Sequence, residues 1–454
     1  MPCTLDAAID YNLSVFAHSV SIPENSLSTE WEALWSQIPT TTAVFALYGQ
    51  DAASEPYITK TANLRRRLKR LLSPDSAASK RLNLAGRIRQ VAFTETGSAL
   101  ETTLLLYAAT RQSFGDRARK RLHLRPPAVL RYTEQNAYPR VFVTNRIALR
   151  SLAYTYGPFP SRVAAERFLD ESLNLFELRR CVEDLHPDPA FPGCIYSEMK
   201  MCLAPCFKGC SDERYAAEAE AVRNYFATRG ASLLATLEQD RNAASTALDF
   251  EKAAQLHARL QKVKAIAQQA APLVHPLDRL DAVVLQLAAD AEHVAMFRVR
   301  AGRIFGPALY SVQGMLHPNE QSGSSSLFAH PTSLAPTPLE SEGTTPRAAR
   351  SALEERLRDL LQQLETSAAA SRPNADGVAD HLAILARWYY RPTAQRTGEI
   401  FFCDASGNFP LPKILRGISR VFRGAKNPED AETPSLATTE ISPSTSTPDV
   451  TFNV

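Results

Sequence analysis

The spacing of apolar residues predicts short strands and helices over the first third of the chain. Residues 43–48 (AVFALY) are a continuous apolar run of strand character, and further strands are expected at 56–59 and 88–94. From 63 to 72 the leucines recur at helical intervals with arginines between them, and a second helix is expected from about 98 to 112. These elements predict a small mixed α/β unit that ends near residue 130.

The rest of the chain alternates between strand-like and helical patterns. The expected elements are, in chain order, an aromatic β-leaning stretch at 138–160, a helix at 161–176, an almost wholly helical stretch at 211–271, alternating strands at 281–313 with Gly302 placed for a hairpin turn, a helix at 347–365, a helix around Trp388, and a short strand at 399–403. Residues rich in Pro, Ser, Thr and Gly between 318 and 346 predict a flexible linker.

Composition narrows the class of protein. The chain has 454 residues, of which 44% are hydrophobic and 22% charged. It is therefore neither disordered throughout nor a small disulfide-stapled fold. No apolar run approaches the length of a membrane span, and no basic segment precedes an apolar stretch at the N-terminus. A cytoplasmic protein without a membrane partner is expected.

The net charge of +3 conceals two strongly basic stretches. Residues 60–89 contain ten Lys and Arg against one acid, and residues 111–131 contain seven against one acid. Such stretches suit a phosphate backbone, although a solvated helix face is the alternative for either one. Two of them so close together favour a nucleic-acid partner. The residues expected to contact phosphates are Arg65, Arg66, Arg67, Lys69 and Arg70.

Four of the seven cysteines form a compact set, Cys181, Cys194, Cys202 and Cys206, spaced C-x12-C-x7-C-x3-C. Reduced thiols at this density predict one soft metal centre, either zinc or a [4Fe–4S] cluster. The alternative is a group of unrelated buried cysteines. Cys210, four residues further on, is expected to be dispensable.

The segment 247–266 predicts one half of an antiparallel helix pair. Phe250, Ala253, Ala254, His257 and Leu260 lie along one stripe of this expected helix. Its small alanines permit close approach of a neighbouring helix, for which 232–243 is the candidate.

Taken together, these segments resemble the UvrC family, the nuclease component of the bacterial excinuclease ABC system. The matching strings, in the family's order, are AYPRVFVT (137–144), YTYGPFPS (154–161), FELRRC (176–181), CIYSEMKMCLAPC (194–206) and LDFEKAAQL (248–256). The resemblance implies nucleotide excision repair on DNA. It also implies that the four cysteines hold a [4Fe–4S] cluster rather than zinc. The last string resembles the UVR motif, which implies that Phe250, Ala253 and Ala254 dock onto an excinuclease B-like protein.

The same resemblance implies a GIY-YIG nuclease at the N-terminus, from which this sequence departs. Tyr57, Lys60 and Arg67 match the family's catalytic positions, whereas Phe45 replaces the first motif tyrosine. Tyr107 stands where the family places its metal-holding glutamate.

Phosphodiester cleavage of this kind needs a divalent cation, and hard Mg²⁺ needs a carboxylate anchor. We therefore expect a degenerate nuclease with no metal at the nuclease site and with Tyr57, Lys60 and Arg67 as vestigial residues. Glu95 or Glu101 would have to substitute for the missing glutamate in an active enzyme, and whether the protein is an enzyme stays open.

A second departure concerns the C-terminal part of the chain. Neither the family's RNase H-like endonuclease domain nor its helix-hairpin-helix units are recognisable after residue 313. A cluster near residue 388 is expected either to stack on unpaired bases or to pack in a core. It consists of Arg387, Trp388, Tyr389, Tyr390 and Arg391.

These observations predict a multidomain α+β protein. The expected parts are an N-terminal extension (1–40), a degenerate GIY-YIG-like domain (41–130), a linker with the cysteine cluster (131–210), a helical region with the UVR hairpin (211–272), a small β module (273–315), a flexible linker (316–346), a mostly helical region of unknown role (347–425) and a disordered tail (426–454).

Three functions are compatible with the sequence. The first is a UvrC-like, DNA-binding, iron–sulfur repair protein with weak or no phosphodiesterase activity. The second is an active endonuclease that incises damaged DNA. The third is a scaffold that contacts only protein partners through the hairpin.

Overall fold

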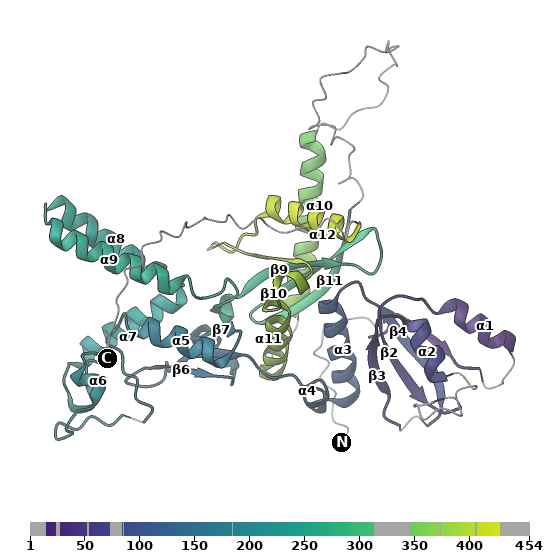
Figure 1. Ribbon diagram of the computed structural model, residues 1–454, viewed down its shortest axis with the longest axis horizontal. Helices are drawn as coiled ribbons and strands as arrows, with labels where there is room; N and C mark the ends of the chain where they lie inside the picture. The colour runs from purple at the N-terminus through teal and green to yellow at the C-terminus, as the bar shows by residue number, and fades with distance from the viewer. Residues whose placement is uncertain are drawn as a thin grey trace, which may run out of the picture.

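The computed structural model describes residues 15–426, apart from 24–27, 52–53, 73–83, 85, 184, 313–345, 371, 373 and 405. The residues within these limits form three four-stranded antiparallel sheets with helices packed around them, so the chain contains both helices and strands, as the predicted α+β class requires. The sheets follow one another in a row, with the C-terminal sheet between the other two (Figure 1). No helix in the described part is long and apolar enough to cross a membrane. The predicted linker at 316–346 and tail at 426–454 lie outside the described residues, except for Pro346 and Lys426.

The N-terminal sheet has the order β1-β4-β2-β3. Its strands are β1 (His18–Ser21), β2 (Ala43–Gly49), β3 (Tyr57–Thr61) and β4 (Ile88–Glu95), and its flanking helices are α1 (Ser28–Gln37) and α2 (Leu64–Leu72). The leucines of α2 fall on one side of the helix and are buried against Phe45 and Leu47 of β2, as their helical spacing predicts. Residues expected to be an extension supply β1 and α1, so this unit begins earlier than residue 41.

The middle sheet has the order β6-β5-β7-β8. Its strands are β5 (Ala128–Tyr132), β6 (Val141–Thr144), β7 (Thr155–Phe159) and β8 (His275–Pro276), and the helices with it are the short helix η2 (Leu149–Tyr154), α5 (Arg162–Leu173) and α7 (Asp212–Ala227). An aromatic core joins Tyr156, Phe168, Tyr225 and Phe226. The cysteine loop between α5 and α7 contains only two short helices, α6 (Ile195–Glu198) and η3 (Pro205–Phe207).

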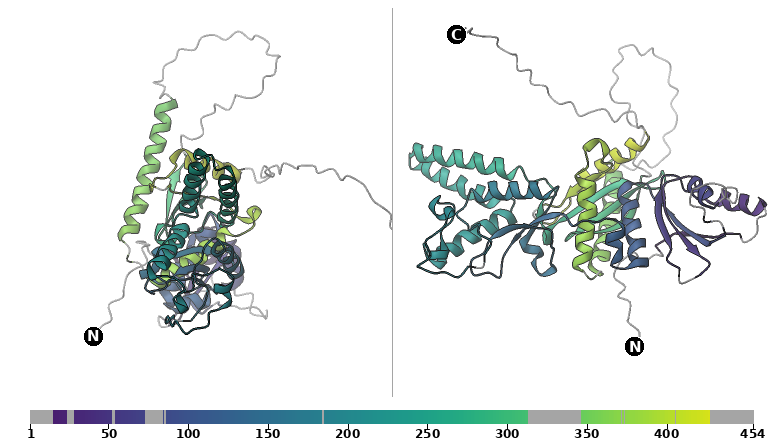
Figure 2. Two further views of the ribbon diagram at one scale, coloured as in Figure 1. Left: turned by 90° about the vertical axis from the view of Figure 1, so that its left-hand side faces the viewer. Right: turned by 60° about the horizontal axis from the view of Figure 1, so that its bottom comes forward.

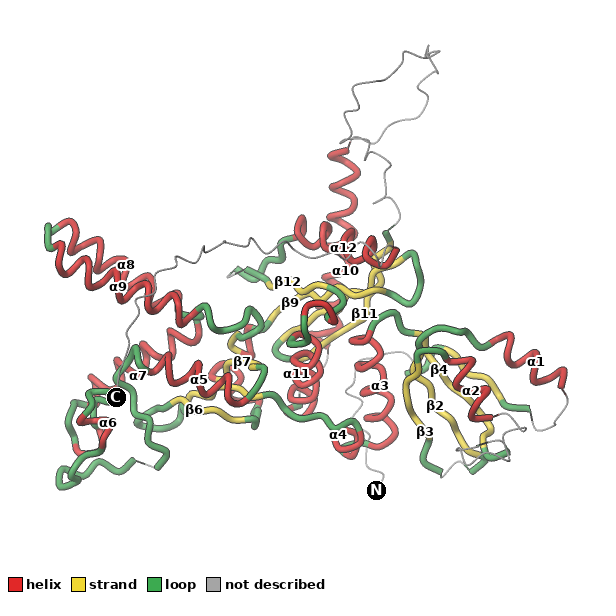
Figure 3. Tube along the Cα trace, in the orientation of Figure 1, coloured by secondary structure: helices red, strands yellow, loops and turns green. Residues whose placement is uncertain are grey.

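Two long helices, α8 (Ala231–Thr246) and α9 (Phe250–Ala267), form the expected antiparallel pair. The pair projects from the middle unit at the end of the molecule opposite the N-terminal sheet (Figure 1, Figure 3). The chain then returns to the middle sheet as β8, so the segment just after the hairpin belongs to that sheet and not to the β module that follows.

The C-terminal sheet has the order β11-β10-β9-β12. Its elements are the short helix η4 (Leu277–Arg279), β9 (Asp281–Leu287), β10 (His293–Arg300), β11 (Arg303–Ser311), α10 (Pro346–Ala370), α11 (Ala375–Tyr389), the short helix η5 (Thr393–Gln395), β12 (Glu399–Phe402) and α12 (Leu411–Lys426). The hairpin between β10 and β11 turns at Gly302 with φ of +79°, as predicted.

Alternation along β9 places its side chains on two buried faces. Ala282 and Val284 pack toward α11, whereas Val283 and Leu285 pack toward α10 and α12. The segments 273–315 and 347–425, which the sequence suggests are separate, thus form one three-layered unit from β9 onward, with β12 as the fourth strand.

The N-terminal and C-terminal units are joined by α3 (Ala99–Phe114), which is followed by the short helix α4 (Arg117–Arg121). Leu100, Leu104 and Tyr107 of α3 are buried in the core that includes α11 and β9, and α3 and α11 lie side by side (Figure 2). This helix therefore connects the two units through a shared core.

Candidate functional site

The nuclease-like residues on the N-terminal sheet come together in part. Tyr57 begins β3 opposite Leu47, and Arg67 lies on α2, where its Nη2 donates a hydrogen bond of 3.4 Å to the Tyr57 hydroxyl. Lys60 is exposed on the same strand. Phe45 is fully buried, with its ring centroid 6.4 Å from that of Tyr57, so it serves as a core residue. Tyr57 and Arg67 are therefore in contact with each other.

The basic residues of α2 are divided between structural contacts and solvent. Arg65 donates from Nε to the carbonyl of Ile38 at 2.6 Å, and the Lys69 ammonium lies 5.6 Å from the ring centroid of Trp35. Arg66 and Arg70 are exposed. The burial of the helix's leucines directs these cations outward, and such a surface suits a phosphate backbone.

Tyr107, at the expected metal-ligand position, faces the C-terminal unit. Its hydroxyl donates to Asp380 Oδ2 at 3.1 Å, and Arg119 Nε donates to the other carboxylate oxygen at 2.6 Å. Burial and the neighbouring carboxylate raise the pKa of Tyr107 well above its usual value. The His381 ring lies edge-on to the Tyr107 ring, with 5.4 Å between the two ring centroids. Tyr107 shares its core with α11, whereas Tyr57 packs against a different core.

The two carboxylates that would have to replace a metal-holding glutamate are already engaged. Glu95 accepts a short hydrogen bond from the Thr41 hydroxyl. Glu101 accepts from the Gly97 N–H at 2.8 Å, and burial raises its pKa to about 7. In the described part of the chain, no group of three or more His, Cys, Asp or Glu side chains is arranged to hold a metal ion.

Arg179 makes several contacts within the cysteine loop, although it is not one of the predicted site residues. This side chain is only 1% exposed. Its Nε donates to the Tyr138 carbonyl at 2.9 Å, and its Nη1 donates to the Glu183 carbonyl at 3.0 Å and lies 3.6 Å from Cys181 Sγ. The only signal for it in the sequence is the paired arginine before Cys181.

The pKa of Cys202 depends on burial and on the other three predicted thiols. Burial raises the pKa of Cys202 to about 11, and the negative charge of Cys181, Cys194 and Cys206 adds to that effect. Burial raises the pKa of Cys210, and the negative charges of Asp212 and Cys206 add to that effect.

These residues fit a soft metal centre in donor chemistry. Four thiols are the donor set of a zinc or [4Fe–4S] site. Arg179 Nη2 is buried without a hydrogen-bond partner among the described residues, and a buried cation beside Cys181 suits thiolates rather than neutral thiols.

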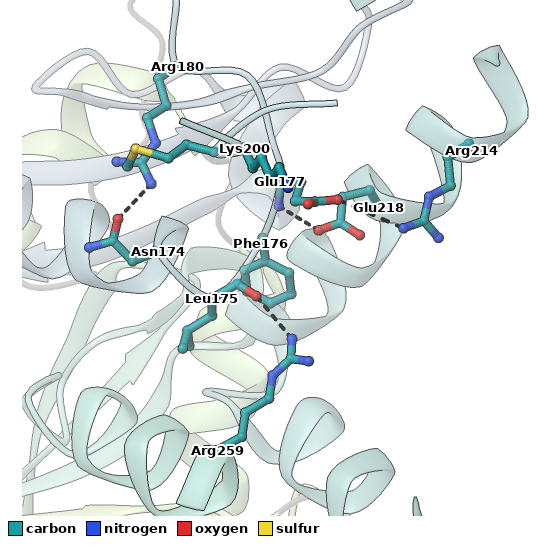
Figure 4. A pocket seen from close by; sticks show the side chains of 10 residues that line it. Asn174, Leu175, Phe176, Glu177, Arg180, Lys200, Arg214, Glu218 and Arg259 are labelled. Carbon is teal, nitrogen blue, oxygen red and sulfur yellow. Dashed lines mark hydrogen bonds and ion pairs between the residues drawn. The ribbon is translucent and has the colours of Figure 1, made fainter. Parts of the chain in front are cut away.

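A charged groove of about 440 Å³ lies between the cysteine loop and the helices α7 and α9 (Figure 4). Arg180 Nη2 donates to Asn174 at 2.8 Å, and Arg259 donates to the Leu175 carbonyl at 3.3 Å. Glu218 accepts from the Glu177 N–H at 2.7 Å. These contacts connect the start of the loop to both helices.

The predicted partner-binding residues lie near the tip of the helical hairpin. Asp249 caps α9 by accepting from the Lys252 N–H at 3.0 Å. Phe250 is 67% exposed and its neighbour Leu248 is 71% exposed. Ala254 is also exposed and Ala253 is half-buried. Phe250 is therefore not packed in a core of the described part of the chain, and the tip presents an apolar surface to solvent.

Comparison with known proteins identifies the class to which these parts correspond. Residues 128–225 match the family model "UvrC/Cho excinuclease, middle domain", and residues 231–266 match the "UvrB/uvrC motif". These two segments of the chain are therefore similar to UvrC proteins, as their motifs suggest.

Curated relatives carry the name UvrABC system protein C. The protein from Alcanivorax borkumensis is 28% identical over 55% of this chain and 41% of its own length, and that from Desulforudis audaxviator is 29% identical over 57% and 42%. The protein from Oleidesulfovibrio alaskensis is 29% identical over 58% of this chain and 38% of its own. The chain thus spans less than half the length of these relatives. No solved structure matches it.

Proposed function

We propose that this protein is a DNA-binding component of nucleotide excision repair whose N-terminal unit makes little or no incision. One observation supports this most directly. A UvrC-type middle domain and a UVR-type hairpin adjoin a nuclease-like unit in which Tyr107, at the expected metal-ligand position, is bound to Asp380. The protein would position DNA and a partner for cleavage by a separate active site.

DNA binding is assigned to the outer face of α2. Arg66, Lys69 and Arg70 are exposed there beside the Tyr57–Arg67 pair. No carboxylate occurs in α2 to neutralise them. Contacts of this kind position a phosphate backbone without reading bases.

The cofactor is proposed to be a [4Fe–4S] cluster held by Cys181, Cys194, Cys202 and Cys206, with zinc as the alternative. When bound, the cluster would cross-link a loop that has only two short helices of its own. Arg179 would balance the negative charge of the thiolates from its buried position.

The partner is proposed to be an excinuclease B-like protein that receives the hairpin tip. Phe250 and Leu248 expose apolar surface at the turn between α8 and α9, and Ala254 leaves room for a helix to approach.

The alternative function is that of an active endonuclease, and the contact between Tyr57 and Arg67 supports it. A nuclease assay distinguishes the two functions. The test is nicking of damaged and undamaged duplex DNA by the full chain with Mg²⁺ or Mn²⁺. We expect DNA binding without nicking above background. Metal-dependent incision that Arg67→Ala abolishes would establish the endonuclease. Absence of DNA binding, with partner binding retained, would establish the scaffold.

A further inference from the structure

A large basic cleft forms where the middle and C-terminal units meet. Its volume is about 750 Å³. One wall is the C-terminal end of α11, and the other comes from the segment between α4 and β5, the end of β6 and the start of α5. None of the sequence motifs lies wholly within it, because its parts are far apart along the chain.

The charge of the lining is uniformly positive. The charged side chains that line it are Arg125, Arg162, Arg387 and Arg391, and no Asp or Glu among the described residues lines it. Arg162 pairs with Glu166 on the next turn of α5, and Arg387 donates to the His123 carbonyl at 3.1 Å. Arg125 and Arg391 have no side-chain partner among the residues that the structure describes, so their guanidinium groups are available to a ligand.

The elements that form the walls of the cleft are fixed in place by contacts that do not involve Arg125 or Arg391. Tyr390 donates from its hydroxyl to the Pro158 carbonyl at 2.7 Å, and Trp388 donates to the Thr397 carbonyl at 3.1 Å. Trp388 is only 3% exposed, so core packing rather than base stacking is its role. Arg119 binds Asp376 and Asp380 of α11. The arginines are thus presented by a preformed frame, which lowers the entropic cost of binding.

The arginine side chains that line the cleft favour a ligand with several phosphates. Guanidinium groups bind phosphate oxygens through paired, charge-assisted hydrogen bonds. The start of α5 at Arg162 adds the positive end of a helix dipole. Cations drawn from three segments around one cleft suit an extended polyanion better than a single small anion.

We propose that this cleft binds the phosphodiester backbone of a single nucleic-acid strand. The inference rests on the proposed function, in that it assumes a protein that works on DNA, and it adds a second binding surface to that of α2. A volume within the roughly 300–1,000 Å³ of ligand pockets admits a short piece of one strand and not a duplex. Arg125 and Arg391 are the residues that contact phosphates most directly.

The test compares two charge-matched double variants of the full chain. Arg125→Gln with Arg391→Gln removes two cations from the cleft. Arg356→Gln with Arg358→Gln removes two from exposed positions on α10, which contributes no residue to the cleft. Binding of a short fluorescent single-stranded oligonucleotide is measured by anisotropy between 50 and 200 mM salt. The cleft variant is expected to bind roughly tenfold or more weakly, with a log–log salt slope smaller by about 1.4, whereas the control variant binds as wild type.

A second measurement uses the unchanged protein, so that it does not depend on the folding of a variant. Arginines are modified with phenylglyoxal with and without the oligonucleotide and then mapped by mass spectrometry. The strand is expected to protect Arg125 and Arg391 but not Arg356 or Arg358. Equal protection at all four positions would overturn the proposal.

The outcomes distinguish this inference from the proposed function. If the cleft variant binds the single strand as wild type does, while neutralising Arg66 and Arg70 abolishes binding, the cleft assignment fails and the proposed function stands. If the cleft variant loses affinity only for duplex, the assignment to a single strand fails. If wild-type protein binds neither single strand nor duplex, both proposals fail together.

Discussion

At the scale of single residues, Glu101 is a carboxyl whose ionisation opposes folding. Burial raises its folded pKa from 4.5 to about 7. Its contribution to stability is therefore fully present below about pH 4.5 and is lost as the pH rises through about 7. We predict that Glu101→Gln is more stable than wild type by about 1–2 kcal/mol at pH 8 and equal to it near pH 4. Denaturant unfolding at the two pH values measures this, and an equal difference at both would contradict it.

The cysteine set makes a second prediction at this scale. Anaerobically purified protein is expected to contain iron and sulfide and to show the broad visible absorption of an iron–sulfur cluster. Cys202→Ser should abolish that absorption because it removes one of the four proposed ligands, and a [4Fe–4S] cluster takes four cysteines. Cys210→Ser, the matched control, should retain it. Stoichiometric zinc without iron would replace the iron assignment with zinc.

At the scale of elements, the helical hairpin is a rigid support for an exposed aromatic ring. Because Phe250 is 67% exposed, Phe250→Ala should change the free energy of unfolding by less than about 0.5 kcal/mol. The same change should abolish binding to an excinuclease B-like protein, since exposed aromatic anchors dominate small interfaces. Calorimetry with the purified partner measures the loss. Gln261→Ala, on the same helix away from the tip, is the control, and retained binding by the Phe250 variant would contradict the docking role.

The basic face of α2 leads to a prediction of how DNA binding depends on salt concentration. Arg66→Gln and Arg70→Gln should each weaken duplex binding to a similar extent for unrelated sequences, and each should lower the log–log salt slope by about one. The expectation follows from the exposure of both side chains on a helix whose leucines are buried. Arg358→Gln controls for net charge. Binding that is unchanged by the double substitution would make this surface a solvated face only.

At the scale of the whole molecule, the Tyr107–Asp380–Arg119 contact connects the N-terminal and C-terminal units. Asp380 is 1% exposed, so Asp380→Ala would leave a buried hydroxyl unpaired and remove one of the two carboxylate partners of Arg119, the other being Asp376. A loss of about 2–3 kcal/mol is expected, against about 1 kcal/mol for Tyr107→Phe, which leaves the ion pair intact. Limited proteolysis should separate the two units more readily in the Asp380 variant. Unchanged stability in both variants would show that the contact does not hold the units together.

Local patterns in the sequence determined much of the secondary structure and some of the site. The leucine spacing of α2, the alternation of β9 and the turn at Gly302 predicted their elements, because burial on one side of a helix or strand imposes a period on neighbouring residues. The shared metal centre that the spacing of the four cysteines indicates stays a prediction.

Only the tertiary structure decided how distant segments meet. Tyr107 and Asp380 are 273 residues apart, and nothing near either one in the chain indicates the other. The pairing of β12 with β9 and the convergence of Arg125 with Arg391 are of the same kind. A local period records whether a side chain is buried but not which partner buries it. The fold selects that partner by joining surfaces that are compatible in shape and charge, and those surfaces exist only once the units have packed together.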